Sequence, residues 1–371
     1  MPRTLENRRK FQVCMVAPFA PHKGGVTVQA ELLTACLQKE GIGILRVDTN
    51  LQRLRHKGLG PIRLAIQPWV ILFRLFRQLP KSDVVHFQSA SYWGYMPTII
   101  GVPLAKLFRK RCVITYQGGR GPDFMDRFPW LVKMPFRLAT LSTVCSRELQ
   151  RAFQQRGVQT ELVKNLFDSE LFKFRERTKV EPKLVWNRSM DEVYDPISAL
   201  KVYEIVKERY PSATLVMTSN GALAGAVREY VDKHGLDGVR LSGRVPKEEL
   251  AKIIDEADIC LNTSKVDGLP TALLEAAASG LPIVTTKAGG IPYLFENGKS
   301  AVIVEIGDVE ALSNAIIDLL ENPSKALKMG FAARDVASEY TWSSVSKEIM
   351  RIYGIISECE DITHSSVATI N

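Results

Sequence analysis

The stretch that decides the fold is DICLNTSKVDGLPTALLEAAASGLPIVTTKAGGIPYLFENGKSAVIV, residues 258–304. Its first residues form a mostly apolar run that predicts a buried strand, and a Gly-Leu-Pro turn then leads into a helix that we expect to begin near Thr271. Two more strand-like runs, PIVTT and AVIVE, follow this helix. Because parallel strands need a crossover connection, this order predicts a parallel sheet covered by helices.

The same alternation continues on both sides of this stretch. In the second half, strand-like runs are separated by helices that we expect at 196–209, 222–235, 246–256, 270–279 and 308–321. The first half alternates in the same way, from FQVCMVAP to TELVKN, and the polar segment KFRERTKVEPK at 173–183 is expected to be an interdomain linker. We therefore predict an α/β protein with two doubly wound parallel sheets, in domains 1–175 and 180–342, and a last helix at about 345–360 that packs back on the first domain.

Composition and charge narrow the class of protein. With 46% hydrophobic and 24% charged residues, the chain of 371 residues has the composition of a globular protein with room for two cores. The six cysteines lie far apart without a CxxC pair, which predicts reduced thiols in a cytoplasmic chain. Residues 1–180 hold 30 Lys and Arg against 12 Asp and Glu, a net charge of +18, whereas the rest of the chain carries −9. The first half is thus expected to face an anionic partner, such as a membrane surface, a phosphorylated lipid or nucleic acid.

Two acids flank the start of the helix expected near Thr271. Ligands of parallel sheets bind beyond the carboxyl ends of the strands, where helix N-termini favour phosphate groups. Asp267 precedes the helix and can contact a sugar attached to such a phosphate, while Glu275, in the first turns, can accept hydrogen bonds from ribose hydroxyls. The alternative interpretation is that Asp267 caps the helix and Glu275 has a structural role.

A longer pattern resembles the donor-site signature of retaining glycosyltransferase family 4, the glycosyl transferases group 1. It comprises DGLPTALLE at 267–275, AAASGLPIV at 276–284, KAGG at 287–290 and ENGKSAVIV at 296–304. The resemblance implies GT-B architecture, in which two Rossmann-like domains face each other across a cleft. It also implies an enzyme that moves a sugar, with retention of configuration, from a nucleotide diphosphate sugar to a hydroxyl acceptor. UDP is expected rather than GDP, the acceptor is expected to be lipid-linked or a growing polysaccharide, and no metal or cofactor is expected.

The resemblance also implies roles for individual residues. Asp267, where the family usually has Glu, would meet the donor sugar and support positive charge at its anomeric carbon, and Glu275 would bind the ribose. Arg188, after the strand KLVWN, would stabilise the nucleotide leaving group, but the Lys that usually follows this Arg is missing. The other donor-binding positions implied are Gly24, Gly25, Asn220, Gly221, Gly243, Arg244, Val245, Gly268, Leu269, Pro270 and Thr271.

Two polar residues of the first domain are candidates for contact with the sugar or the acceptor. Where many family members have a His, this chain has Gln117, which can form hydrogen bonds but cannot act as an acid or a base. The other candidate is His86, although a His within a strand is more often a core residue. For Gly24 and Gly25, a simple strand-to-helix turn is the alternative to a loop close to the donor phosphates.

The segment PWVILFRLFRQL, residues 68–79, predicts a mostly apolar helix, with Arg63, Arg74 and Arg77 along a narrow polar face. One interpretation is a core helix with a solvated face. The other is an interfacial surface that attracts anionic lipid and presents a membrane-bound acceptor. The charge of the first half favours the second interpretation, which predicts a peripheral protein on the inner face of a membrane and disfavours nucleic acid as the partner.

Two other functions stay open on the sequence alone. A GT-B-shaped UDP-sugar 2-epimerase uses the same donor cleft without an acceptor, but it needs histidines and carboxylates there, and the chain has five His. A non-catalytic sugar-nucleotide-binding protein is compatible with the departures at Asp267 and Gln117. A dehydrogenase is disfavoured because no GxGxxG follows the first strand.

Overall fold

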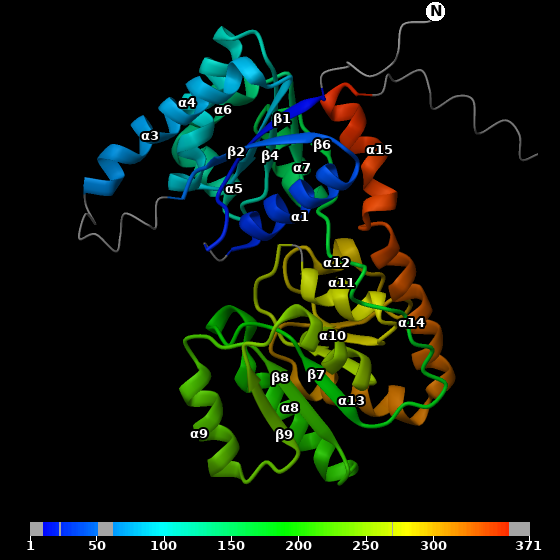
Figure 1. Cartoon of the computed structure of the whole chain (residues 1–371). Coiled ribbons are helices and arrows are strands. Elements are labelled where there is room, and N and C mark those ends of the chain that lie inside the picture. Colours follow the sequence, from blue (N-terminus) through cyan, green and yellow to red (C-terminus); the bar gives the residue numbers. More distant parts are fainter. Residues whose placement is uncertain (1–9, 22–23, 51–61, 269, 356–371) are drawn as a thin grey trace, which may run out of the picture. The chain divides into compact units, whose positions relative to one another are not determined.

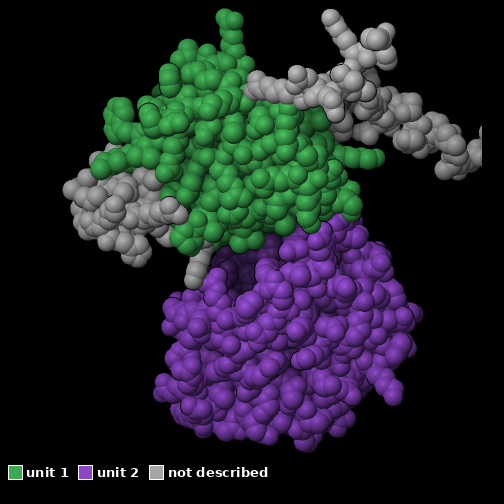
Figure 2. All heavy atoms as spheres, viewed as in Figure 1, with its two compact units in different colours: residues 1–166, 342–371 green, residues 167–341 purple. Residues whose placement is uncertain are grey.

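A computed structural model gives the structure of the protein for residues 10–21, 24–50, 62–268 and 270–355. The chain divides into two compact units (Figure 2). Unit 1 comprises residues 1–166 and 342–371, and unit 2 comprises residues 167–341. The boundary that was predicted at 175–180 therefore lies within unit 2, and the chain crosses between the units twice.

Unit 1 is built on a six-stranded sheet in which neighbouring strands are parallel. Its strands in spatial order are β2 (Gly43–Asp48), β1 (Gln12–Ala17), β3 (Val84–Ser89), β4 (Arg111–Tyr116), β5 (Leu141–Val144) and β6 (Glu161–Leu162). The strand order reverses between β1 and β3, and the carboxyl ends of these strands form the switch point at which open α/β sheets bind ligands.

Helices cover both faces of this sheet (Figure 1). The first face carries α3 (Ile62–Gln78), α4 (Met96–Leu107), α5 (Gly121–Arg127), α6 (Pro129–Leu138) and α7 (Arg147–Gln155), with the short helices η1 (Leu79–Lys81) and η2 (Tyr92–Tyr95) in the connections. The opposite face carries α1 (Gly25–Lys39) and α15 (Trp342–Tyr353). α15 therefore contributes Ile349 and Tyr353 to the same core as Leu33 and Leu37 of α1, although about 300 residues separate the two helices in sequence.

Unit 2 has a second six-stranded sheet whose neighbouring strands are also parallel. Its strands in spatial order are β12 (Val302–Val304), β11 (Ile283–Thr286), β10 (Ile259–Asn262), β7 (Lys183–Trp186), β8 (Thr214–Thr218) and β9 (Val239–Gly243). The order reverses between β7 and β10, which places the switch point of this unit beyond the carboxyl ends of these two strands.

The five helices that were predicted between residues 196 and 321 are all present. The described helices of unit 2 are η3 (Glu192–Tyr194), α8 (Pro196–Arg209), α9 (Ala224–His234), α10 (Lys247–Glu256), α11 (Thr271–Ala278), α12 (Ile291–Leu294), α13 (Val309–Glu321) and α14 (Pro323–Ser338). Carboxylates cap two of them: Asp195 accepts from the Ser198 amide at the start of α8, and Asp308 accepts from the Ala311 amide at 2.9 Å at the start of α13. None of the helices in the described ranges combines the length and hydropathy needed to span a bilayer.

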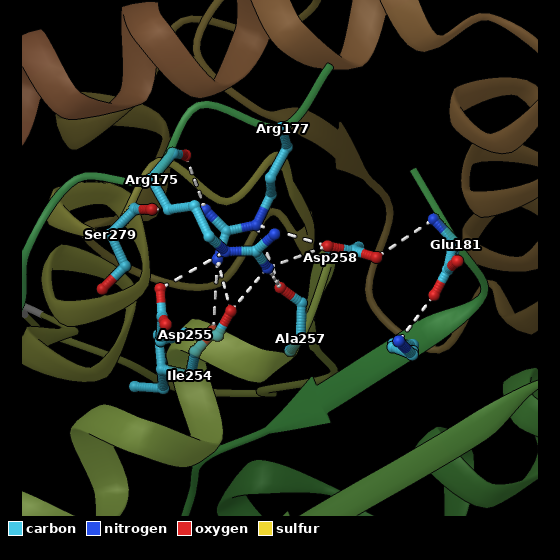
Figure 3. A network of polar contacts seen from close by, with 9 residues as sticks. Arg175, Arg177, Glu181, Ile254, Asp255, Ala257, Asp258 and Ser279 are labelled. Carbon is cyan, nitrogen blue, oxygen red and sulfur yellow. Dashed lines mark hydrogen bonds and ion pairs between the residues drawn. The ribbon is translucent and has the colours of Figure 1, made fainter. Parts of the chain in front are cut away.

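The segment predicted as a linker, 173–183, is instead fixed to unit 2 (Figure 3). Arg177 is almost fully buried, and its guanidinium donates hydrogen bonds to five backbone carbonyls, including that of Ala257 at 2.9 Å. Arg175 contacts the carboxylate of Asp258 at 3.0 Å. Most of these carbonyls lie at the end of α10 or just after α11, where a helix leaves its last carbonyl groups short of amide donors, and the two arginines supply donors there. The segment 173–183 is therefore polar because its arginines anchor it to unit 2, and not because it is a free linker.

Candidate functional site

Two charged residues meet at the switch point of the unit 2 sheet. Arg188 follows β7 and Asp267 follows β10, and these two strands are neighbours. Arg188 Nη2 donates a hydrogen bond to Asp267 Oδ2 at 2.5 Å, and both side chains are less than a tenth exposed. The Arg188 guanidinium also lies 4.1 Å from the centre of the Tyr194 ring, a cation–π contact that helps to hold it. Two residues that were assigned to different parts of a donor thus form one buried ion pair.

Some polar atoms around this pair are buried without a protein partner. Among the described residues these atoms include Arg188 Nε and Asn187 Oδ1. Burial raises the pKa of Asp267, and the Arg188 guanidinium and the Gly268 amide act in the opposite direction. Because a buried donor left without an acceptor costs free energy, this arrangement suits a ligand that brings acceptor oxygens to Arg188, as a phosphate does.

The Gly-Gly turn after β11 holds the Asp267 loop in place. The Gly290 amide donates a hydrogen bond to the backbone carbonyl of Asp267 at 2.8 Å. A Cβ at Gly289 would lie 2.1 Å from this carbonyl oxygen, and a Cβ at Gly290 would lie 2.0 Å from the carbonyl oxygen of Gly268. Only glycine permits so close an approach, so the KAGG part of the signature has a packing role that positions Asp267.

A second buried carboxylate, Glu275, lies in the second turn of α11 with its side chain 5% exposed. Lys247 Nζ donates a hydrogen bond to Glu275 Oε1. Burial raises the pKa of Glu275, the charges of Lys247 and Arg188 lower it, and the charge of Asp168 raises it further. Since the charge of Arg188 acts on both Asp267 and Glu275, the two carboxylates belong to one electrostatic site.

Lys247 is a site residue that the sequence pattern did not reveal. It is the first residue of α10, where the positive end of the helix dipole disfavours a cation. Its ammonium group lies 5.5 Å from the centre of the Phe172 ring. In the sequence VPKEEL, residues 245–250, a basic residue at a helix start is unusual, but this does not indicate a contact with Glu275, which is 28 residues away. Lys247 thus brings a second cation to the site from the start of α10.

Two predicted donor-site glycines, Gly221 after β8 and Gly243 at the end of β9, are explained by the local backbone. A Cβ at Gly221 would lie 2.4 Å from the carbonyl group of Met190, so this glycine lets the loops after β7 and β8 pack together. Gly243 has a φ of +66°, in the left-handed region that favours glycine. Their roles in binding a donor stay predictions.

The other predicted donor residues of unit 2 lie at the same edge of the sheet or at the start of α11. Pro270 immediately precedes α11, Thr271 is its first residue, and Leu269 lies outside the described residues. The remaining positions are the exposed Asn220, Arg244 and Gly268 and the half-buried Val245.

In unit 1 the two candidates for contact with a sugar differ in their burial and in their hydrogen-bond partners. Both ring nitrogens of His86 have partners at 2.7 Å, Nδ1 with the Tyr353 hydroxyl and Nε2 with the Thr115 hydroxyl. Burial lowers the pKa of His86 to about 3, so the ring is neutral. His86 is therefore held by protein partners on both sides of its ring, but it lines the same small cavity as Gln117, and its contact with a sugar or an acceptor stays a prediction. Gln117 is half-buried at the end of β4 and donates a hydrogen bond to the Gln88 side chain, so its role stays a prediction.

The glycine loop of unit 1 leads directly into α1. Gly24 occupies the capping position with an extended backbone, which any residue can adopt, and Gly25 is the first residue of the helix. A Cβ at Gly25 would meet nothing within 4 Å. Packing within the protein does not explain the glycine at this position, and its closeness to a donor stays a prediction.

α3 differs from its prediction in the direction of its side chains. Arg74 turns inward and donates a hydrogen bond to the Asp48 carbonyl at 2.5 Å, so it does not lie on an outer polar face. Arg77 is exposed, and the side chain of Arg63 lies outside the described residues. The exposed side chains of the described part of this helix also include the aromatic ones of Trp69, Phe73 and Phe76.

Sequence comparisons connect this site to a known family. Residues 168–336 match the sequence model of the glycosyl transferases group 1. Glycogen synthase from Mycobacterium tuberculosis is 28% identical over 231 residues, which are 60% of this chain and 55% of that protein. Sulfoquinovosyl transferase from Arabidopsis thaliana is 27% identical over 320 residues, which are 78% of this chain and 59% of that protein. The chain spans about half the length of the curated relatives that it matches.

Solved structures share the fold. HepE from Anabaena, in complex with UDP, has a TM-score of 0.73 and 15% sequence identity, with 93% of this chain and 100% of that chain covered. The predicted fold class, α/β with two doubly wound parallel sheets as in GT-B proteins, is confirmed. Arg188, Asp267, Glu275 and Lys247 all lie in residues 168–336, the part of this GT-B chain that has the sequence pattern of the glycosyl transferases group 1.

Proposed function

We propose that this protein is a retaining glycosyltransferase that moves a sugar from a nucleotide diphosphate sugar to a hydroxyl acceptor. The observation that carries the proposal is the pair of contacts Arg188–Asp267 and Lys247–Glu275 in one electrostatic site, inside the segment that matches the group 1 model. Two buried carboxylates and two cations suit a ligand that carries both hydroxyl and phosphate groups.

In this reaction each side chain has a separate task. Glu275 accepts hydrogen bonds from the ribose hydroxyls, and Asp267 supports positive charge at the anomeric carbon. Arg188 stabilises the charge that develops on the diphosphate as the bond between the anomeric carbon and the phosphate oxygen breaks. The acceptor hydroxyl attacks on the face that the nucleotide leaves, and its proton passes to the departing phosphate. We propose that the reaction uses no metal.

UDP is the proposed nucleotide, with GDP as the competing one. HepE, which shares the fold, has been crystallised with UDP and with UDP-glucose. For the acceptor we propose a hydroxyl of a lipid-linked sugar or of a growing polysaccharide.

A thermal-shift experiment tests the donor assignment. UDP and UDP-sugars are expected to raise the unfolding temperature, because a ligand that binds only the folded state stabilises it by about 2.7 kcal/mol at 100 times its Kd. GDP and ADP at equal concentration are the comparison, and Arg188→Gln should lose most of the response. A response to GDP alone would change the assigned base. The absence of any response to nucleotide diphosphates or their sugars would refute the proposal.

Labelled UDP-sugars separate transfer from the two alternative functions. Transfer predicts a product that requires an acceptor, with slow hydrolysis in its absence. A 2-epimerase would release the epimerised sugar without any acceptor, and a non-catalytic protein would bind the donor without turnover.

Lys247→Met is expected to raise the donor KM and to shift the acid limb of the pH profile upward. The charge of Lys247 lowers the pKa of Glu275. Removing that charge therefore raises this pKa, so Glu275 loses its charge at a higher pH and donor binding weakens there first. Methionine keeps much of the aliphatic stem against Phe172 and removes only the ammonium group.

Two further variants make the Lys247 test specific. Lys247→Arg should restore the position of the acid limb, since it restores a cation. Lys252→Met, at an exposed position of the same helix, should leave the profile unchanged. An unshifted acid limb in Lys247→Met would assign Lys247 a packing role only.

We also propose that the protein works at an anionic membrane surface on its cytoplasmic side. The support is the charge of the first half, where residues 1–180 carry a net +18. Lys and Arg near a membrane surface contribute about 1 kcal/mol each to binding of anionic lipid, and the attraction falls within a Debye length.

A further inference from the structure

Three large aromatic side chains of α3 face solvent. Trp69, Phe73 and Phe76 are 71%, 62% and 60% exposed. Their spacings of four and three residues place them on one side of the helix, while Ile71 and Leu75 are fully buried on the other side, in the core beneath. A single exposed apolar residue is ordinary, but adjacent aromatic rings along one helix face indicate a surface that binds something apolar.

The neighbouring helix extends this surface. α3 and α4 lie side by side, and α4 packs against α6 in the same layer (Figure 1). The Phe76 ring meets the ring of Phe108, just after α4, edge to face with centres 5.4 Å apart, and the adjacent Leu107 is 77% exposed. We call Trp69, Phe73, Phe76 and Leu107 the aromatic face. Trp130, near the start of α6, adds another exposed indole to this layer.

The sequence segment that holds α3 and α4 carries charge of almost one sign. Between residues 49 and 122 the sequence holds twelve Lys and Arg and a single acid, Asp83. The Asp83 carboxylate accepts a hydrogen bond from the Gln12 amide at the start of β1, so it is directed to the sheet and not to the outer side of α3. Arg77 and Lys106 adjoin the aromatic face in sequence and are both exposed. The partner of this surface is therefore expected to be anionic as well as apolar.

An anionic bilayer meets both requirements. Aromatic rings are favoured at the boundary between headgroups and acyl chains, and Lys and Arg beside them attract anionic headgroups, a combination typical of helices that lie in the plane of the interface. A second copy of the chain fits less well. A twofold interface would place the same cationic surfaces opposite each other, where like charges repel.

We infer that the aromatic face inserts into the interface of an anionic lipid bilayer, so that unit 1 binds the membrane by burying aromatic side chains as well as by charge. The inference rests on the membrane contact proposed above and is independent of the assignment of the donor. It concerns residues that are already exposed, so their substitution is not expected to disturb the core.

Vesicle binding by the full chain tests the inference. The protein is expected to sediment with vesicles of phosphatidylglycerol and phosphatidylcholine, and more weakly with pure phosphatidylcholine. The triple variant Trp69→Ala, Phe73→Ala, Phe76→Ala should lower the partition constant by about 100-fold, since each ring contributes at least about tenfold when fully buried and less when partly inserted. The matched control is Tyr293→Ala with Ile306→Ala, which removes exposed apolar side chains from unit 2 and should leave the partition constant for vesicles unchanged.

Two readouts separate insertion from attraction by charge. Lipids with brominated acyl chains should quench the fluorescence of the wild type more strongly than that of Trp69→Phe, which keeps an apolar ring and should still bind within about threefold of the wild type. Raising the salt concentration should weaken binding without abolishing it, because burial of apolar area is not screened.

The possible outcomes separate insertion of the aromatic face from a purely electrostatic contact with the membrane. Binding that salt abolishes and the triple variant leaves unchanged would overturn insertion and leave the electrostatic contact standing. No binding to either kind of vesicle would overturn both. A dimer in vesicle-free solution that the triple variant dissociates would assign the aromatic face to a second copy, and so overturn the inference. The triple variant should keep the wild-type response to UDP, which shows that the donor site is independent.

Discussion

Replacing Glu275 with alanine should lower kcat/KM for the donor by about 100-fold or more. A hydrogen bond to a charged group contributes about 1.5–3 kcal/mol, and one carboxylate can accept from both ribose hydroxyls, so the loss of two such bonds corresponds to this factor. Because the ribose is held in the ground state and in the transition state alike, the loss should appear mainly as a higher donor KM. Steady-state transfer at donor concentrations below KM measures it most directly.

The fold should survive this substitution. Glu275→Ala leaves Lys247 without its partner, but the Lys247 side chain is 46% exposed and can be solvated. Glu249→Ala, which removes an exposed acid from α10, is the control and should keep wild-type activity. In the wild type, a donor with 2′-deoxyribose should have a lower kcat/KM than the ribose donor, and this difference should become much smaller in Glu275→Ala. Wild-type turnover by Glu275→Ala at low donor concentration would mean that the donor site has been assigned to the wrong residues.

The second large effect is expected on stability. Arg177→Met should destabilise unit 2 by about 3–5 kcal/mol, the range typical when one partner of a buried charged network is removed. The substitution leaves five backbone carbonyls without the guanidinium that now donates to them. Burial lowers the pKa of Arg177 to about 10, so the side chain is still charged at neutral pH and its hydrogen bonds are charge-assisted.

Urea unfolding followed by circular dichroism measures the effect of Arg177→Met as a lower midpoint. Arg209→Met is the matched control, because the Arg209 side chain is 66% exposed and its ion pair with Glu321 is long, at 3.4 Å. An exposed pair contributes less than about 1 kcal/mol, so this midpoint should hardly move. Equal midpoints for the two variants would show that the network in Figure 3 does not anchor the segment 173–183.

The architecture could be predicted from the sequence because the signals for it are local. Strand-like runs alternate with helical ones, and α11 has the sequence Gly-Leu-Pro before it and an Ala-rich, buried sequence within it. Capping acids such as Asp308 mark where helices begin. Each predicted helix of unit 2 therefore lies within two residues of its observed bounds.

The pairing of charges in the site could not be predicted in the same way. Arg188 and Asp267 are 79 residues apart, and they meet because β7 and β10 are neighbours in the sheet. No local pattern states which strands will be neighbours, and the same holds for Lys247 and Glu275. The signature indicated which residues gather at one edge of the sheet but not which would form pairs.

Amino-acid composition gave wrong predictions for the segment 173–183 and for α3, because there the direction of each side chain decides its role. The arginines of the segment 173–183 look solvated in the sequence, yet Arg177 is buried against carbonyl groups. In α3, the apolar residues outnumber the places available in the core, so Trp69 and its neighbours remain outside while Arg74 turns inward. Periodicity assigns apolar residues to the core unless something else covers them.

The packing of α15 has a consequence for how the chain matures during synthesis. Unit 2 is a single continuous segment, so it can finish folding as soon as it has left the ribosome. Unit 1 is translated first, but Ile349 and Tyr353 of its core are added near the end of the chain. Throughout translation of unit 2, the nascent protein therefore lacks α15 on one face of the unit 1 sheet, and the His86 ring lacks its Tyr353 partner. Unit 1 is therefore translated first, but its core is completed only after unit 2 has been translated.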